Sequence, residues 1–383
     1  MKINELPTPC YVIDENIIEE NCKVLADVMK KTGCHVLLAQ KAFSNYALYP
    51  LIGKYLSGTT ASGLYEARLG REEMGRENHV FAPAYKDEDM DELVKICDHI
   101  VFNSISQLEK HKEKCRNVSI GIRVNPEFST QNGHEIYDPC GKGSRLGVTA
   151  DLLRNADLTG IDGLHFHTLC EQNSDDLKKT LDVVEEKFDF LLRKVKWVNF
   201  GGGHHITRKD YDVELLCDCI THIKEKYNVK VYIEPGEAVA LNAGYFITTV
   251  LDKVKNSGIT CLILDGSAAC HMPDVLEMPY TPPLSEGSII ETPEKEFDYR
   301  LGGNTCLAGD IIGNYRFDHY VQIGERLTFC DMAIYSMVKN NTFNGIPLPS
   351  IYSMDRNGDC RLIKSFGYND FKDCLLYTSD AAD

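Results

Sequence analysis

The sequence predicts an α/β protein in which a (β/α)8 barrel is joined to a smaller antiparallel β domain. Short apolar runs alternate with amphipathic helical segments, which is typical of a parallel sheet. Eight such runs fall within about 200 residues, the number of strands that closes a barrel. Beyond Leu241 the chain changes to short strands separated by Gly, Pro and Asn, which indicates a second, antiparallel architecture.

The eight runs precede the change at Leu241. The predicted barrel strands are 35–42, 55–62, 79–85, 99–104, 118–126, 163–168, 197–203 and 230–237. The amphipathic segments between them include 65–76, 87–97, 175–194 and 210–227. A doubly wound open sheet is the alternative, but it requires Gly-x-Gly-x-x-Gly after the first strand, and that motif is not found there.

The β domain is predicted to be discontinuous in sequence. Its later strands are predicted at 260–265, 296–301, 320–330 and 360–365, and the strand-like segment 9–14 is expected to pair with them. The predicted domains are therefore 15–240 for the barrel, and 1–14 with 241–375 for the β domain. Residues 376–383 carry no pattern and receive no role.

Composition narrows the class of protein and its partners. The 383 residues are 43% hydrophobic and 26% charged, as in soluble globular proteins. The net charge of -16 argues against a nucleic acid or an anionic membrane surface as partner. The chain has no apolar run of about 18 residues and no signal peptide at its start, so we expect neither membrane insertion nor secretion.

The cysteines indicate a reducing compartment. There are 15, an odd number, and they are scattered without a Cys-x-x-Cys pair. Neither a disulfide framework nor a structural zinc site is suggested by that pattern. We therefore expect reduced thiols, a cytoplasmic location and no metal.

Lys41 ends the apolar run His-Val-Leu-Leu-Ala-Gln-Lys at the point where the first barrel strand should stop. Reactive residues of such barrels collect at the carboxyl ends of the strands. A desolvated lysine there has a lowered pKa and is suited to forming a Schiff base. The alternative is a lysine whose stem covers the strand end while its ammonium stays in water.

Other strand ends carry an anion cradle and two ionisable side chains. Gly201, Gly202 and Gly203 end the seventh strand, where backbone N–H groups can approach a phosphate, or they form a flexible turn. His204 follows and can add a donor. Glu234 begins Glu-Pro-Gly236 after the eighth strand, either as a turn carboxylate or as a partner that keeps a pyridine nitrogen protonated.

His167 completes this set, because it lies at the end of the sixth predicted strand, two residues after His165. It is either a structural histidine or an imidazole lying flat on a cofactor ring. An amine, a phosphate cradle and a carboxylate at barrel strand ends together match pyridoxal 5′-phosphate (PLP).

The residues carry a resemblance that covers nearly the whole chain, from Thr8 to about Phe371. The sequence resembles the alanine racemase-like, fold-type III PLP-dependent decarboxylases, including ornithine decarboxylase, and within them the carboxynorspermidine/carboxyspermidine decarboxylases. The motifs that carry it are Leu-Ala-Gln-Lys41-Ala-Phe, Ser144-Arg145-Leu-Gly147, Gly201-Gly-Gly-His-His, Glu234-Pro-Gly-Glu237-Ala, His271-Met-Pro-Asp274, Cys306-Leu-Ala-Gly-Asp310 and Thr342-Phe-Asn-Gly345.

The resemblance implies roles for individual residues. Lys41 would be the Schiff-base lysine, His167 would stack on the ring, and Glu234 would face the pyridine nitrogen. The phosphate would be bound by Gly201–Gly203 with Tyr335, and Arg145, His204 and Gly236 belong to the same cofactor-binding set. The resemblance also implies a homodimer in which Cys306, as proton donor, and Asp310 reach into the partner's site.

One departure from the family points to the substrate. Ornithine and diaminopimelate decarboxylases usually follow Glu-Pro-Gly with Arg, whereas this chain has Glu237. The loss of that cation counts against a second substrate carboxylate. We expect Glu237, Asp274 and Asp310, with His271 nearby, to recognise the ammonium groups of a polyamine.

The implied reaction is decarboxylation of carboxynorspermidine or carboxyspermidine in polyamine biosynthesis. The alternatives are a decarboxylase of diaminopimelate, ornithine, lysine or arginine, and an inactive relative that binds a partner protein. From the residues alone Cys306 could also be a core thiol. The two preferred substrates differ by one methylene, which the sequence does not distinguish.

Overall fold

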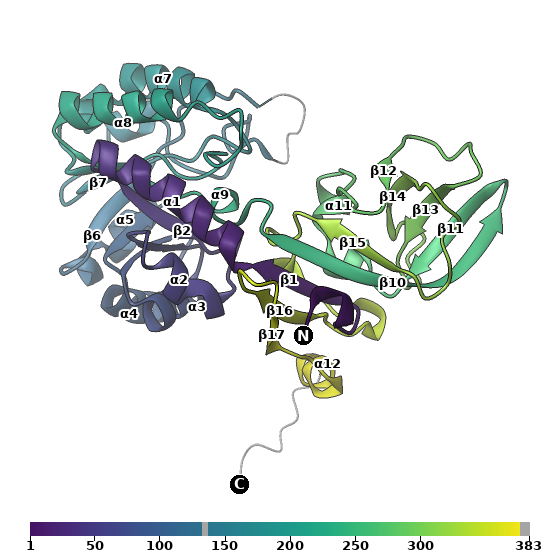
Figure 1. Ribbon diagram of the computed structural model, residues 1–383. Coiled ribbons are helices and arrows are strands. Elements are labelled where there is room, and N and C mark those ends of the chain that lie inside the picture. Colours follow the sequence, from purple (N-terminus) through teal and green to yellow (C-terminus); the bar gives the residue numbers. More distant parts are fainter. Residues whose placement is uncertain (132–136, 376–383) are drawn as a thin grey trace, which may run out of the picture. The chain divides into compact units, whose positions relative to one another are not determined.

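The computed structural model describes residues 1–131 and 137–375 and contains two compact units. One unit is Glu19–Val239, and the other combines Met1–Ile18 with Ala240–Asp383. The last eight residues, 376–383, for which no role is predicted, lie outside the described residues. Figure 1 shows the ribbon with its helices and strands labelled.

The first unit is a closed barrel of parallel strands. In barrel order they are β2 (His35–Ala39), β3 (Gly58–Ala61), β4 (Glu77–Phe81), β5 (His99–Phe102), β6 (Ser119–Arg123), β7 (Gly163–His165), β8 (Trp197–Asn199) and β9 (Lys230–Ile233). The barrel closes where His35 and Val36 of β2 lie in register with Tyr232 and Ile233 of β9. Every strand overlaps one of the eight predicted runs, so the predicted barrel is confirmed.

The barrel interior is filled around Trp197, the single tryptophan of the chain. A Cβ on Gly163 of β7 would lie 2.0 Å from the Trp197 indole, and one on Gly121 of β6 would lie 2.4 Å from it. The indole therefore occupies space that a side chain at either glycine, on β6 or on β7, would need. Two glycines next to one large ring keep the packing dense without strain.

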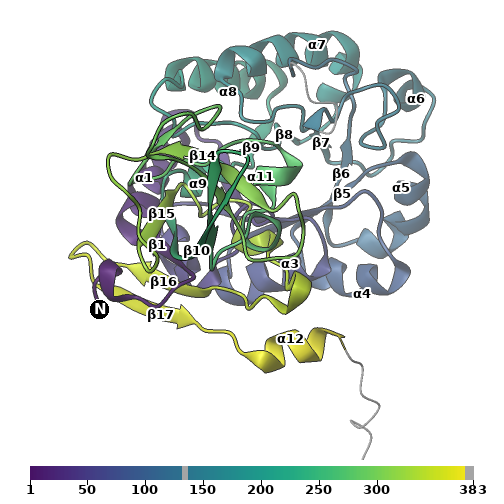
Figure 2. The same ribbon diagram turned by 90° about the vertical axis from the view of Figure 1, so that its right-hand side faces the viewer.

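One helix, α1 (Glu15–Thr32), precedes the first barrel strand, and the other helices of this unit follow barrel strands. These are α2 (Tyr49–Ile52), α3 (Leu64–Leu69), α4 (Asp87–Ile96), α5 (Ile105–His111), α6 (Ala150–Arg154), α7 (Ser174–Leu192), α8 (Val213–Tyr227) and α9 (Glu237–Ala240). Figure 2 shows α4 to α8 lying outside the strands. The two ends of α8 show how the sequence sets the limits of a helix. Asp212 accepts a hydrogen bond from the Leu215 N–H at the start, and Asn228 adopts a left-handed conformation (φ 54°) at the end.

Single helical turns complete this unit and the other one. They are Ile3–Glu5, Tyr46–Leu48, Gly70–Met74, Lys112–Cys115, Met337–Lys339 and Phe343–Gly345. Among the described residues, no helix has the length and apolar character needed to cross a membrane.

The second unit is a nine-stranded sheet. Its strands are β1 (Cys10–Asp14), β10 (Gly244–Asn256), β11 (Ile259–Leu264), β12 (Ser288–Ile289), β13 (Asp298–Gly302), β14 (Ile311–Arg316), β15 (Arg326–Cys330), β16 (Ser350–Met354) and β17 (Cys360–Lys364). Two short helices, α10 (Ala268–His271) and α11 (Asp274–Glu277), lie between β11 and β12, and α12 (Tyr368–Leu375) follows the last strand. The order is β12-β14-β13-β11-β10-β1-β16-β17, and β15 pairs with β10.

The sheet is mixed, whereas the sequence predicts an antiparallel domain. Most pairs are antiparallel, but β1 runs parallel to β16 and β11 runs parallel to β13. In both cases a long connection separates the partners in sequence, as parallel pairing requires. The N-terminal strand β1 lies between β10 and β16.

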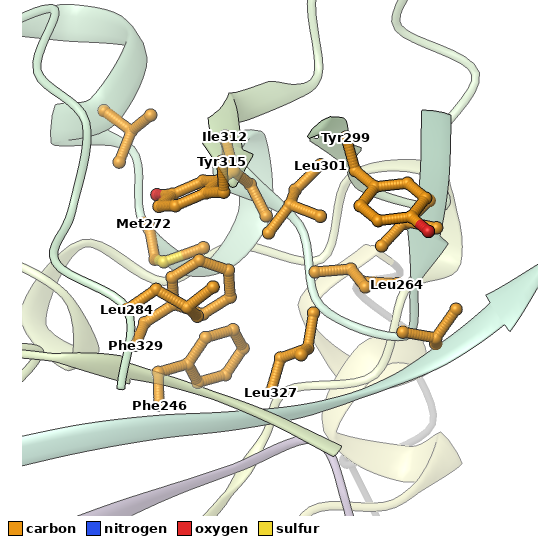
Figure 3. Close-up of a cluster of buried hydrophobic side chains, with 14 of the residues drawn as sticks. Phe246, Leu264, Met272, Leu284, Tyr299, Leu301, Ile312, Tyr315, Leu327 and Phe329 are labelled. Carbon is orange, nitrogen blue, oxygen red and sulfur yellow. The ribbon is translucent and has the colours of Figure 1, made fainter. Parts of the chain in front are cut away.

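An apolar core lies against this sheet and is shown in Figure 3. Aromatic rings from several strands meet in it, and Phe246 of β10 lies next to Phe329 of β15, with ring centroids 6.5 Å apart. Tyr315 of β14 joins them and donates a hydrogen bond to the Pro282 carbonyl at 2.7 Å. The buried ring keeps its hydroxyl satisfied, as a core tyrosine must.

Candidate active site

A cavity of roughly 200 Å³ lies inside the barrel unit, at the carboxyl ends of its strands. This is the end of a (β/α)8 barrel at which active sites form. Four of the predicted site residues line it, Lys41, Arg145, His167 and Glu234. The other lining residues are Ala39, Thr60, Ala61, Ser62, Phe81, Pro83, Arg123, Leu146 and His165.

Lys41 follows β2 and directs its amine into this cavity. The side chain keeps contact with solvent through the open cavity, yet the surrounding barrel wall desolvates the ammonium. That desolvation, followed by the charge of Arg123, lowers the pKa of Lys41 below its ordinary value. A lowered pKa increases the fraction of neutral, nucleophilic amine near pH 7.

Glu234 follows β9 and is buried as an ion. Asn199 Nδ2 donates to Glu234 Oε1 at 2.7 Å, and His165 Nε2 lies 3.4 Å from Oε2. Burial opposes ionisation, but the hydrogen bond and charge of His165, with the Asn199 bond, outweigh it and lower the pKa of Glu234 to about 2. The cavity therefore contains a fixed negative charge at neutral pH.

His167 has a defined tautomer. The Gly202 N–H donates to His167 Nδ1 at 2.8 Å, so the ring proton of the neutral imidazole is on Nε2. Burial, with the positive charge of Lys41 next, lowers the pKa of His167 well below its ordinary value. The ring at the cavity wall is therefore neutral and held in one orientation.

The glycine triplet differs from the sequence-based expectation of three exposed N–H groups. Gly201 donates to Asn199 Oδ1 at 2.9 Å and Gly202 donates to His167, so two of the three donors are already used. The Gly203 N–H has no partner among the described residues. A Cβ at any of the three would clash, the closest being Gly203, where it would lie 2.0 Å from the Leu169 carbonyl oxygen.

Further unsatisfied donors lie next to this triplet. His204 is buried, and neither of its ring nitrogens has a hydrogen-bond partner in the described part of the chain. The Gly236 N–H likewise has none there, and a Cβ at Gly236 would lie 2.5 Å from the Ala42 methyl group. Buried polar groups without partners are uncommon and indicate a missing ligand. Burial lowers the pKa of His204 to about 4, so its imidazole is neutral near pH 7 and can donate one N–H. Gly203, Gly236 and His204 can therefore bind an anion through N–H groups.

Two arginines contribute positive charge to the cavity. Arg123 at the end of β6 is buried, with its guanidinium carbon 4.5 Å from the centre of the Phe81 ring, and it donates to the His167 carbonyl at 3.1 Å. Burial lowers the pKa of Arg123 to about 10, so it remains charged at neutral pH. Arg145 is exposed, and its carbonyl accepts a hydrogen bond from Asn103.

Glu237 begins α9 beside the Glu-Pro-Gly turn and pairs with a histidine of the same unit. Its Oε2 lies 3.2 Å from His205 Nε2. Both side chains are largely buried, at 12% and 9% exposure. Glu237 is not among the residues that line the cavity.

The sheet unit contains the remaining predicted residues. Cys306 is exposed in the connection between β13 and β14, and its N–H donates to Asn344 Oδ1 at 2.7 Å. This hydrogen bond connects the Cys306-Leu-Ala-Gly-Asp310 motif with the Thr342-Phe-Asn-Gly345 motif. Tyr335 follows β15 in a left-handed conformation, with φ 47°.

Asp310, His271 and Asp274 each have partners within the same unit. Asp310 is buried, and it accepts hydrogen bonds from Ser267 Oγ at 2.8 Å, Thr305 Oγ1 at 2.7 Å and the Ala269 N–H at 3.1 Å. These bonds fix the loop that carries Cys306. His271 accepts from the Ser267 N–H at 3.2 Å, and Asp274 forms an ion pair with Lys339.

The barrel residues fit PLP as a ligand. Lys41 offers a desolvated amine, Glu234 a buried negative charge and His167 a flat, neutral ring. The unsatisfied donors of Gly203, Gly236 and His204 fit a phosphate. Each of these groups matches one part of PLP. Among the described residues that line the cavity, Arg123 is the one buried charged side chain that this assignment does not use.

The fold and this site together define a pyridoxal-dependent decarboxylase, and the chain belongs to that family. Residues 10–333 match the family described as "Pyridoxal-dependent decarboxylase, C-terminal sheet domain". This match confirms the resemblance and the class of enzyme that the motifs predict.

Individual relatives match along their whole length. The chain is 43% identical to carboxynorspermidine/carboxyspermidine decarboxylase of Campylobacter jejuni, over 97% of this chain and 99% of that protein. It is 38% identical to carboxyaminopropylagmatine decarboxylase of Synechocystis, over 98% and 97% of the two chains. The crystal structure of the Campylobacter jejuni carboxynorspermidine decarboxylase complexed with norspermidine matches with a TM-score of 0.90, covering 96% of this chain and 99% of that one.

Three site residues are not predicted from the sequence as functional, namely Arg123, His165 and Asn199. Each lies on a barrel strand, in an apolar context that reads as core. A signal is present, because all three are the last residues of their strands, where inward-facing polar side chains reach the cavity.

Proposed function

We propose that the protein uses PLP to decarboxylate a carboxylated triamine, carboxynorspermidine or carboxyspermidine, to norspermidine or spermidine. The observation that carries this proposal is one barrel cavity that contains both the desolvated amine of Lys41 and the ionised carboxylate of Glu234. The identity to relatives named for these substrates supports the choice of substrate.

The proposed cofactor contacts follow from the site. Lys41 would hold PLP covalently, His167 would lie on its ring, and Gly203, Gly236 and His204 would bind its phosphate. We retain Gly201, Gly202, Tyr335 and Arg145 as supporting residues of the cofactor site. When bound, PLP supplies an electron sink for the pair released as carbon dioxide leaves.

The protein's own groups would control charge and protons. Glu234 would keep the pyridine nitrogen of bound PLP protonated, and Asn199 and His165 keep the carboxylate in place. The Lys41 amine, when free, would take up and return a proton beside the substrate. His167, fixed by the Gly202 N–H, keeps the ring plane oriented without adding charge.

We also propose a homodimer with shared active sites. In this arrangement Cys306 of one subunit gives a proton to the α-carbon of the substrate bound in the other. The exposed thiol and the anchoring of its loop by Asn344 and Asp310 support this role. No cysteine forms a disulfide within the described residues, which fits the proposed reducing, cytoplasmic location.

The substrate's amines are proposed to meet acidic residues. Asp274, Asp310 and Glu237 are the candidates. His271 is close to Asp274 in sequence, and it shares the hydrogen-bond partner Ser267 with Asp310. Asp310 has a second task, because its three hydrogen bonds order the loop that carries Cys306. Charge-assisted hydrogen bonds to ammonium groups favour a polyamine over a dicarboxylate.

A substrate panel tests this proposal. Purified holoenzyme is assayed for carbon dioxide release with carboxynorspermidine, carboxyspermidine, carboxyaminopropylagmatine, meso-diaminopimelate, ornithine, lysine and arginine. We expect kcat/KM for a carboxylated triamine to exceed that for diaminopimelate by at least about 100-fold, the cost of two or more lost ionic contacts. A higher kcat/KM for diaminopimelate would refute the proposed substrate class. If no compound is turned over, the alternative of an inactive relative that binds a partner protein would be favoured.

A further inference from the structure

A histidine-rich cluster lies at the amino-terminal ends of the barrel strands, and the proposed reaction does not use it. His35 begins β2, Glu77 begins β4 and His99 begins β5, while His79 lies two residues into β4. The catalytic cavity is lined by residues at the opposite, carboxyl ends of the strands. The cluster is therefore a separate feature of the same barrel.

Nitrogen atoms of the three imidazoles surround one carboxylate. His79 Nε2 lies 3.0 Å and His99 Nε2 lies 3.8 Å from Glu77 Oε1, while His35 Nδ1 lies 3.7 Å from Oε2. The rings of His79 and His99 stack with centroids 4.0 Å apart. Stacking directs both Nε2 atoms towards the same carboxylate oxygen.

His99 is the unusual member of this cluster. Its side chain is only 11% exposed, yet it forms no hydrogen bond within the part of the chain that the structure describes. Its Nε2 stands 3.8 Å from Glu77, too far for a hydrogen bond. The buried Nδ1 of His99 also has no partner there, so both ring nitrogens lack a hydrogen bond among the described residues.

His79 Nε2 and Glu77 Oε1 share a hydrogen bond, which a bound ion would replace. The ligand atoms of the cluster are also spaced as a metal ion requires. Zinc bound at about 2.0–2.1 Å in a tetrahedron separates its ligand atoms by roughly 3.4 Å. The separations of 3.0 and 3.8 Å bracket that value, and ligand atoms of Glu77, His79 and His99 all lie within 4.8 Å of one another. Metal binding requires the stacked rings of His79 and His99 to turn so that their in-plane lone pairs converge on one point.

The carboxylate of the cluster is held in place from outside. Tyr232 donates to Glu77 Oε1 at 2.9 Å and orients the carboxylate, as an outer partner of a metal ligand does.

We propose that this cluster binds one divalent transition-metal ion of the zinc type. Glu77, His79 and His99 supply three ligands, and His35 supplies the fourth after a small movement. Imidazole and carboxylate ligands favour zinc, cobalt, nickel or copper over calcium or magnesium. The ion has a path from solvent, because Glu77 is 24% and His35 is 34% exposed. The ion would join three strands at the end of the barrel away from the reaction.

The single tryptophan gives a direct test. The indole of Trp197 stacks on His99, with ring centroids 4.7 Å apart. Paramagnetic Co²⁺ bound to His99 should therefore quench the fluorescence of the chain's only tryptophan. The holoenzyme is titrated with Co²⁺ after its exposed thiols have been blocked, since Cys306 and Cys374 would otherwise bind the metal. We expect quenching that saturates at one equivalent and is reversed by excess Zn²⁺.

Three variants decide whether the cluster is the site. His99→Gln and Glu77→Gln should each weaken Co²⁺ binding at least about tenfold, because each removes a ligand. His222→Gln is the matched control, since His222 lies on α8 and pairs with Glu185 far from these strands in sequence. Far-UV circular dichroism establishes which variants fold. If His99→Gln does not fold, the Co²⁺ affinity of Glu77→Gln decides the test. Absence of saturable quenching, or equal affinity in wild type and a folded ligand variant, overturns the proposal.

Discussion

Replacing Glu234 with glutamine removes the fixed negative charge of the cavity while keeping its shape. Glutamine can still accept the Asn199 hydrogen bond at the position of Oε1. Against the effect of burial, hydrogen bonds from His165 and Asn199 lower the pKa of Glu234 to about 2, so the wild-type carboxylate is ionised at neutral pH. A hydrogen bond to a charged group contributes about 1.5–3 kcal/mol. A protonated pyridine nitrogen loses that stabilisation in Glu234→Gln, so kcat should fall on the order of 10- to 100-fold.

The assay separates electronics from binding. Carbon dioxide release is measured at saturating carboxynorspermidine and PLP, and bound PLP is quantified from its visible absorbance. Glu234→Gln should retain most of its PLP while losing kcat. Glu185→Gln is the control, because Glu185 lies on α7, where it pairs with His222 and Lys226 and not with any residue of the cavity. It should leave kcat unchanged.

Two results would refute this reasoning. An unchanged kcat in a fully loaded Glu234→Gln enzyme would show that the carboxylate does not control the ring nitrogen. Loss of PLP with normal kcat per bound cofactor would show that Glu234 serves binding alone.

Three further predictions concern the cofactor and the dimer. Borohydride reduction of the holoenzyme should fix the cofactor to the peptide that contains Lys41, and mass spectrometry that finds it on another lysine would contradict the assignment. Gly203→Ala should raise the Kd for PLP at least about tenfold, measured by equilibrium dialysis, because a Cβ would lie 2.0 Å from the Leu169 carbonyl in a residue with φ 82°; an unchanged Kd would remove Gly203 from the phosphate site. Lys41→Ala and Cys306→Ala enzymes should each be nearly inactive, and an equal mixture should recover up to roughly a quarter of wild-type activity through heterodimers with one intact site. No recovery after subunit exchange, verified by mass spectrometry, would show that Cys306 does not act across a dimer.

The barrel is predictable because its strands are buried on both faces. Runs such as Val36–Ala39 in β2 are apolar without interruption, which indicates a parallel strand covered on both faces, and the number of such runs favours a closed barrel over an open sheet. The strand β10 is not predicted, although it is 13 residues long. Its first half is buried and its second half is exposed, so neither an apolar run nor a regular alternation extends over the whole strand.

The site is predictable as a set of residue types at strand ends, but its hydrogen bonds are not. The sequence predicts Lys41 and Glu234, because a charged residue after an apolar strand is conspicuous. It does not reveal that Asn199 engages both Glu234 and the Gly201 N–H, since that bond depends on the separation of two strands. The histidines 35, 79 and 99 stand at the start of three predicted strands, but only closure of the barrel brings them to one carboxylate.

The position of β1 in the middle of its sheet affects how the chain is made. Cys10 of β1 pairs with Ser350 of β16, 340 positions later. During synthesis the first strand must wait unpaired on that side until nearly the whole polypeptide has left the ribosome, whereas the barrel residues are complete much earlier. The barrel can therefore assemble while translation continues, and the sheet can be finished only after it ends. A message truncated before the codon for Ser350 would yield a barrel attached to a sheet with an open edge beside β1, a surface prone to pairing with other chains.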